Sequence, residues 1–226
     1  FLPSADRGAV RRALSLPEDR CLLLSIRPLA PRMGLENLIR AMPEVVAHRP
    51  DVLLLIGGKG PERERLQQIC HELRLENVVR LIGFIPDDRL ADYYQASDLF
   101  VLPTLALEGF GLVTTEALAC GVPVIAQNVS AIPEVVGPGG VLIDPERLIT
   151  VPAGHDLWLP DINAFTEALE KLYTDEVLRN ELGLAGRKHV AESFRWDVAV
   201  DRFHDFIEAS ASRWRSSQEA TTDGPG

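Results

Sequence analysis

Two glutamates, Glu108 and Glu116, stand eight residues apart around the glycine-rich turn Gly109-Phe110-Gly111. A helix predicted to begin at this turn directs free N–H groups and the positive end of its dipole at any anion placed there. Glycine lets the backbone approach a bulky anion, and carboxylates accept hydrogen bonds from hydroxyl groups. The combination predicts a sugar nucleotide as ligand. Taken singly, each acid also fits an ordinary explanation, a loop carboxylate or a favourable charge near a helix start.

Cationic side chains follow two of the predicted strands. Arg27 and Arg32 come after the strand predicted over 21–26, and Lys59 follows Gly58 in the loop after the next strand. Ligands of open α/β folds bind at the carboxyl ends of the strands, so these side chains are candidate clamps for a diphosphate. Solvated loop arginines and a simple tight turn remain the alternatives.

The glycine clusters do not match the common nucleotide-binding motifs. Two Gly-x-Gly sequences start at Gly58 and Gly109. The third glycine of a dinucleotide fingerprint is replaced by Arg63 in one and by Thr114 in the other. A P-loop needs Ser or Thr directly after its lysine, but Lys59 is followed by glycine, which excludes a P-loop. The spacing therefore argues against a nicotinamide-dependent oxidoreductase and against a P-loop NTPase.

Composition narrows the function classes further. The 226 residues are 46% hydrophobic, enough for one domain or at most two small ones, and the net charge of −10 argues against a nucleic-acid surface. The three cysteines are widely spaced, as in a reduced cytosolic protein. The histidines show no metal-ligand spacing. No apolar run is long enough to span a bilayer, and the start at Phe1, without Met, indicates a piece of something longer.

Apolar runs alternate with helical patterns over the first two thirds of the chain, which predicts a doubly wound parallel sheet of six strands. Strands are predicted over 21–26, 52–56, 78–82, 99–102, 122–126 and 141–143. Helices are predicted over 34–48, 61–73, 87–96, 111–120 and 130–136, and after the sheet over 162–173, 176–182, 187–193 and 197–214.

Two segments have no clear period. Residues 145–160 are predicted to be irregular, and the polar end 216–226 is predicted to be disordered. The large aromatic residues Tyr94 and Trp196 are interpreted as packing residues, together with Tyr93 and Trp158.

At this point the chain resembles the C-terminal, donor-binding half of a retaining GT-B glycosyltransferase of glycosyltransferase group 1, family four. The resemblance runs from about 20 to 195. It rests on the E-x7-E pair of glutamates, Gly58-x-Gly-Pro-Glu62, Val78-Val-Arg-Leu-Ile-Gly-Phe-Ile-Pro86, Ala96-Ser-Asp-Leu-Phe-Val-Leu-Pro103, Gly121-Val-Pro-Val124, Ile132-Pro-Glu-Val-Val136 and Glu192-Ser-Phe-Arg-Trp196.

The resemblance implies a role for each matching residue. Glu108 would bind the donor sugar and Glu116 the nucleotide ribose. The Gly109 turn, with the amides of Phe110, Gly111 and Leu112, would lie near the diphosphate and sugar, together with Gly58 and Lys59. The backbone around Phe84 and Ile85 would face the base. The implied reaction transfers a sugar from a UDP-, GDP- or ADP-linked donor to a hydroxyl acceptor with retention and without a metal.

Some residues depart from the family pattern. The clamp Arg and Lys of the loop after the first strand are replaced by Pro28 and Met33, and the neighbouring Arg27 and Arg32 are the candidate substitutes. Residues 147–159 resemble an insertion. An alternative interpretation is therefore a non-catalytic nucleotide-sugar-binding or interaction module derived from such an enzyme.

The resemblance also implies an absent partner, the N-terminal domain that binds the acceptor. Without it, the chain is expected to bind the donor but not to catalyse transfer, and peripheral membrane contact through that domain stays open. The expected division is a linker and lead-in helix over 1–20, a donor-binding domain over 21–195, a crossover helix over 196–215 and a disordered tail over 216–226.

Overall fold

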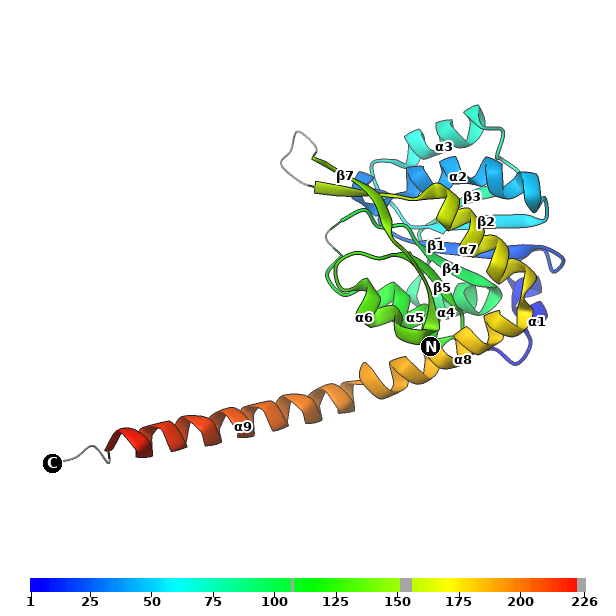
Figure 1. The fold of residues 1–226 in the computed structure, drawn as a ribbon. Helices are drawn as coiled ribbons and strands as arrows, with labels where there is room; N and C mark the ends of the chain where they lie inside the picture. Colours follow the sequence, from blue (N-terminus) through cyan, green and yellow to red (C-terminus); the bar gives the residue numbers. More distant parts are fainter. Residues whose placement is uncertain (107, 151–155, 223–226) are drawn as a thin grey trace.

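The computed structural model describes residues 1–106, 108–150 and 156–222. Its centre is a sheet of six parallel strands in the order β3-β2-β1-β4-β5-β6 (Figure 1). The strands are β1 (Cys21–Ile26), β2 (Val52–Gly57), β3 (Val79–Gly83), β4 (Leu99–Leu102), β5 (Val124–Gln127) and β6 (Gly140–Ile143). The predicted doubly wound α/β fold is confirmed.

Helices cover both faces of this sheet (Figure 1). They are α1 (Arg7–Ala13), α2 (Leu35–His48), α3 (Arg63–Glu72), α4 (Asp87–Ala96), α5 (Leu112–Ala119), α6 (Ile132–Val136), α7 (Ile162–Thr174), α8 (Glu176–Ser193) and α9 (Trp196–Thr222), with a 3₁₀ turn, η1 (Pro31–Met33). Leu23 lies in the core covered by α2, α3 and α7, whereas Leu22 and Leu24 lie in the core covered by α4, α5 and α6. Burial on both faces explains why the strands are nearly continuous apolar runs.

Helix α8 is continuous where the sequence predicts two helices separated near Gly183 and Gly186. Both glycines are buried. A Cβ on Gly183 would lie 2.2 Å from the carbonyl oxygen of Gly121, and one on Gly186 would lie 2.5 Å from Leu118 Cδ2. The prediction of a break was wrong, because these glycines allow α8 to pack closely against its neighbours.

The segment predicted to be irregular forms an antiparallel hairpin of β7 (Pro145–Thr150) and β8 (Asp156–Pro160). That prediction was wrong because the strands are short and each holds only two or three consecutive apolar residues, Leu148 and Ile149 in β7 and Leu157 to Leu159 in β8, too few to show a strand period. The hairpin includes the whole segment interpreted as an insertion, 147–159. Residues 151–155 between its strands lie outside the described part, as does the side chain of Trp158.

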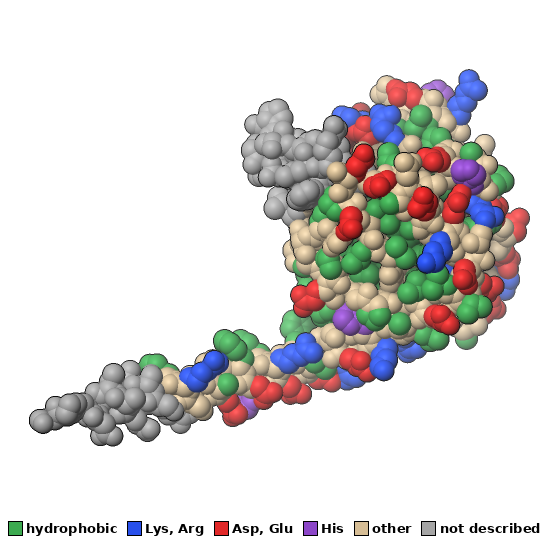
Figure 2. All heavy atoms as spheres, viewed as in Figure 1, with side chains coloured by type: hydrophobic (Ala, Val, Ile, Leu, Met, Phe, Trp, Pro, Cys, Tyr) green, Lys and Arg blue, Asp and Glu red, His purple; other side chains and the backbone are tan. Residues whose placement is uncertain are grey.

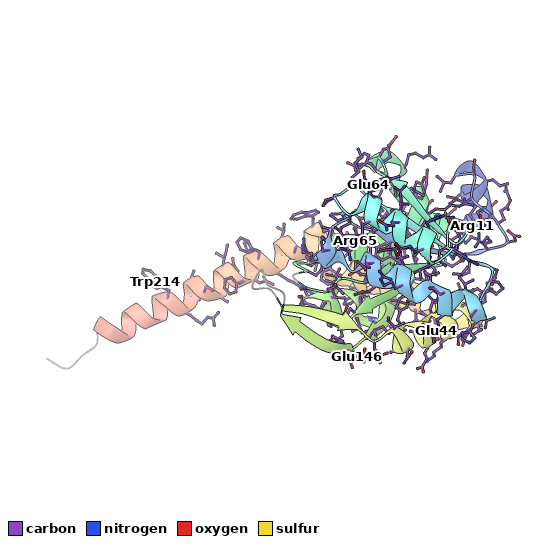
Figure 3. The ribbon with its side chains drawn as sticks, turned by 90° about the horizontal axis from the view of Figure 1, so that it is seen from above. Arg11, Glu44, Glu64, Arg65, Glu146 and Trp214 are labelled. Atoms are coloured by element: carbon purple, nitrogen blue, oxygen red, sulfur yellow. The ribbon has the colours of Figure 1, made fainter. Side chains whose placement is uncertain are left out.

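Helix α9 extends away from the sheet and includes residues 216–222, for which disorder is predicted (Figure 1). Disorder of the tail over 216–226 stays a prediction. Trp196 is 87% exposed, so its interpretation as a packing residue was wrong within this chain. Figure 2 shows hydrophobic side chains among charged ones on α9, and Figure 3 shows Trp214 on this helix, far from the sheet.

The loops that follow β1, β2 and β4 are bonded to one another through their backbones. The N–H of Leu29 donates to Lys59 O at 2.9 Å, and the N–H of Leu105 donates to Arg32 O at 3.0 Å. Gly34, between η1 and α2, has φ of 72°. The three loops therefore form one layer over the carboxyl ends of the strands.

Gly34→Ala should disrupt this layer. A Cβ at this position would lie 1.8 Å from the carbonyl oxygen of Pro103, and the alanine would have to adopt the left-handed φ that Gly34 has. We expect the free energy of unfolding, measured by urea denaturation, to fall by about 2 kcal/mol or more. Gly109→Ala is the control, because a Cβ at Gly109 meets nothing within 4 Å, and it should change stability by less than about 0.5 kcal/mol. Equal losses in both variants would contradict the prediction.

Candidate functional site

The sheet reverses its strand order between β1 and β4. The chain runs from β1 outward to β2 and β3, then returns to pair β4 with the other side of β1. Open α/β sheets bind ligands in the crevice at such a switch point, beyond the carboxyl ends of the strands. Arg27 follows β1 and Glu108 follows β4, so the topology brings both residues to this crevice.

Arg27 and Glu108 form an ion pair across the switch point, through Arg27 Nη2 and Glu108 Oε2. Their side chains are only 5% and 12% exposed. Arg27 Nη2 also donates to Met33 Sδ at 2.9 Å, and Thr104 Oγ1 donates to Glu108 Oε2 at 3.2 Å. Arg27 is therefore a buried residue that holds one oxygen of Glu108, and the alternative of a solvated loop arginine does not apply.

Glu116 lies on α5 and has a different partner. The hydroxyl of Tyr94, on α4, donates to Glu116 Oε2 at 2.8 Å. Burial raises the pKa of Glu116 and nearby Asp87 raises it further, whereas the Tyr94 hydrogen bond lowers it. The carboxylate is thus held partly desolvated with one fixed donor.

The turn between the two glutamates sets the start of α5. Gly111 precedes the helix with φ of 79°, and a Cβ there would lie 3.0 Å from Ile132 Cδ1, so this position requires glycine. Gly109 has no such neighbour. Phe110 packs edge-to-face on Phe194 with ring centroids 5.3 Å apart. The Phe110 and Leu112 side chains are exposed, 40% and 65%, beside the first N–H groups of α5.

The remaining predicted residues lie on the loops after β1, β2 and β3. Lys59 places Nζ 4.7 Å from the ring centroid of Phe84, which is 59% exposed. The N–H of Gly58 donates to Gly83 O at 2.7 Å and ties the second loop to the third. Ile85 is buried, so its side chain belongs to the core. Arg32 lies in η1 with an exposed side chain.

The sequence did not identify Tyr94, Thr104 and Met33 as neighbours of the site residues. Tyr94 was interpreted as a packing residue, and its ring is buried in the core, but its hydroxyl also donates a hydrogen bond to Glu116. Met33 stands where the family pattern has lysine, and it bonds the buried Arg27. Its departure from that pattern was the signal that the loop differs.

Fold and site together define a doubly wound α/β protein with Glu108 at the switch point of its sheet and Glu116 on the helix that follows. A family model described as "Glycosyl transferases group 1" matches residues 6–189. The chain therefore belongs to this glycosyltransferase family. Among the described residues, no helix has the length and apolar character needed to cross a membrane.

Similar proteins of known name support this assignment. The chain is 30% identical over 92% of its length to a Corynebacterium glutamicum protein named GDP-mannose-dependent monoacylated alpha-(1-6)-phosphatidylinositol monomannoside mannosyltransferase, of which the match covers 53%. It is 32% identical over 92% of its length to the Corynebacterium jeikeium D-inositol 3-phosphate glycosyltransferase, of which the match covers 48%. The chain thus spans about half the length of the curated relatives it matches.

Solved structures show the same fold. Sucrose-phosphate synthase from Thermosynechococcus elongatus is 32% identical with a TM-score of 0.76, over 94% of this chain and 50% of that one. The C-terminal domain of a glycosyl transferase group 1 protein, LpcC, from Francisella tularensis is 22% identical with a TM-score of 0.71, over 87% of this chain and 96% of that one.

Arg27→Met tests the structural role of the ion pair. The variant leaves the carboxylate of Glu108 in a desolvated position without its cation, so we expect the free energy of unfolding to fall by about 3 kcal/mol. Urea denaturation measures the loss. Arg32→Met, an exposed change on the same loop, should stay within about 0.5 kcal/mol. A loss in Arg27→Met no larger than in this control would show that the pair does not hold the loops.

Glu116→Gln tests the cost of the desolvated carboxylate. Because the folded state raises the pKa of Glu116, its ionised form is disfavoured there. The neutral variant should therefore melt at a higher temperature than the wild type at pH 8. The difference should shrink as the pH falls through the folded pKa, where the wild-type carboxyl becomes protonated. A difference that does not change between pH 4 and pH 8 would contradict this.

Proposed function

We propose that this chain is the donor-binding half of a retaining glycosyltransferase, which transfers a sugar from a nucleoside-diphosphate sugar to a hydroxyl acceptor. One observation carries the proposal: two carboxylates, Glu108 and Glu116, are held by separate buried partners on either side of the start of α5. That helix start is suited to a diphosphate, and the carboxylates are suited to hydroxyl groups at its two ends.

Each predicted residue takes a role that its surroundings support. Glu108, fixed at one oxygen by Arg27, accepts a hydrogen bond from a hydroxyl of the donor sugar. Glu116 accepts hydrogen bonds from the ribose hydroxyls. Phe84, exposed beside Lys59, flanks the base. Because Arg27 is hydrogen-bonded to Glu108 and Met33, we assign it to holding Glu108 in place. We assign diphosphate binding to the backbone amides of Gly111 and Leu112 and to the exposed cations Arg32 and Lys59.

The chemistry follows from this placement. The bond from the anomeric carbon to the diphosphate oxygen breaks, and a bond from the acceptor oxygen to that carbon forms on the same face of the sugar. The proton of the acceptor hydroxyl passes to the leaving diphosphate oxygen. Negative charge grows on the leaving nucleoside diphosphate, where the N–H groups of α5 stabilise it. No metal is needed to stabilise this charge, because backbone N–H donors and the exposed cations stabilise it.

The donor and the acceptor are proposed by class. GDP-mannose is the first donor to test, because the names of relatives specify it. UDP-sugars come next, because a structure of Anabaena HepE with a TM-score of 0.75 contains UDP and glucose. Since the relatives are about twice as long as the match, we place the acceptor site in the half that the match does not cover, and we expect donor binding without turnover.

Titration calorimetry with GDP, GDP-mannose, UDP and UDP-glucose tests these roles. Glu116→Ala should weaken binding of nucleotide and nucleotide-sugar alike, because both carry the ribose. Glu108→Gln, which keeps the size of the side chain next to Arg27, should weaken chiefly the sugar-bearing ligand, by about tenfold. The control is Glu64→Ala, an exposed acid on α3 (Figure 3), which should leave affinity unchanged.

Two results would contradict the proposal. Equal losses for both ligands in both variants would remove the separate roles of the two glutamates. No binding of GDP-mannose, UDP-glucose or, in a further titration, an ADP-sugar by the wild type would instead favour a non-catalytic interaction module.

A further inference from the structure

We propose that Tyr94 is a positioning residue for Glu116: its buried hydroxyl holds one carboxylate oxygen and so orients the other toward the ligand. This inference deepens the proposed function and rests on it for the identity of the ligand. The contact itself joins two helices, α4 and α5, on the same side of the sheet.

The Tyr94 ring cannot easily change its position. It is fully buried, and its centroid lies 5.6 Å from that of Phe100 and 5.8 Å from that of Phe1, the latter in an edge-to-face arrangement. A ring packed on two sides fixes the direction of its hydroxyl. That hydroxyl reaches Glu116 Oε2 at 2.8 Å, so the carboxylate plane is set by the core rather than by solvent.

The direction of the bond is also defined. An ionised carboxylate only accepts hydrogen bonds, so the phenol is the donor and Oε2 the acceptor. Burial raises the pKa of Tyr94 well above its usual range, so the phenol keeps its proton. The hydroxyl groups of a ribose are donors to the remaining acceptor positions of Glu116. Tyr94 therefore fixes the acceptor without competing for the same role.

The charges around Glu116 explain why a donor is needed there. Burial raises the pKa of Glu116, and the negative charge of Asp87 on α4 raises it further. Burial raises the pKa of Cys120, at the C-terminal end of α5, to about 11, so this thiol stays neutral. The Tyr94 hydroxyl is the neighbour that stabilises the ionised carboxylate through a hydrogen bond. Without it, Glu116 becomes protonated at a higher pH and presents a hydroxyl in place of an acceptor.

Tyr94→Phe removes the hydroxyl and keeps the ring, and Tyr93→Phe is the matched control on the same helix. Calorimetric titration with GDP and UDP between pH 5.5 and 8.5 should show about tenfold weaker binding for Tyr94→Phe at neutral pH. The pH below which affinity falls should also move upward. Tyr93→Phe should match the wild type in both respects. An unchanged affinity and pH profile in Tyr94→Phe would overturn the inference.

A double-mutant cycle separates positioning from general packing. If Tyr94 acts through Glu116, Tyr94→Phe should weaken nucleotide binding in the wild type but not in the Glu116→Ala background. Equal loss in both backgrounds would show that the ring change disturbs the fold instead, and would overturn the inference.

A ligand-free measurement keeps this test apart from that of the proposed function. Carbon-13 NMR of the Glu116 carboxyl should give a higher pKa in Tyr94→Phe than in the wild type. A raised pKa together with no nucleotide binding by the wild type would support the hydrogen-bonding role and reject the proposed function. If the wild type binds nucleotide and the carboxyl pKa of Glu116 is the same in Tyr94→Phe as in the wild type, the positioning role alone is rejected.

Discussion

The ion pair of Arg27 and Glu108 is the interaction on which the candidate site depends, because it joins the two loops that flank the switch point of the sheet. The residues are 81 positions apart in the chain, and both side chains are almost fully removed from solvent. A pair in that environment costs much to desolvate and is retained only with good geometry. Its presence fixes the crevice before any ligand arrives, and Gly34 lets the same two loops approach closely.

The two glutamates are arranged alike, although they come from a loop and a helix. Each carboxylate has Oε2 bonded to a buried partner, Arg27 for Glu108 and Tyr94 for Glu116. Desolvated carboxylates with fixed donors destabilise a fold relative to apolar side chains, and such residues are retained where function requires them. The start of α5 lies between them, with Gly111 in a conformation that glycine tolerates best. Preorganised acceptors around an anion site are the physical basis of the proposed donor recognition.

Much of this architecture could be predicted from the sequence, and the exceptions have physical causes. β1 is found at the predicted residues because a strand buried on both faces is a nearly continuous apolar run, here interrupted only by Ser25 and bounded by Arg20 and Arg27. The break predicted near Gly183 failed because the sequence does not show that Gly121 packs against it. The loops of Arg27 and Glu108 could be placed at one edge of the sheet, but which cation meets which acid depends on side-chain packing across the whole fold.

The central claim is that the loops at the switch point form a preformed nucleotide site around the start of α5. Its most direct test is an amide NMR titration of this chain with GDP, GDP-mannose and UDP-glucose. The account predicts saturable shifts at Gly58, Phe84, Gly111 and Leu112, and none at Asp98, which directly precedes β4 at the amino ends of the strands. Shifts confined to other regions, or no shifts with any of these ligands, would contradict it.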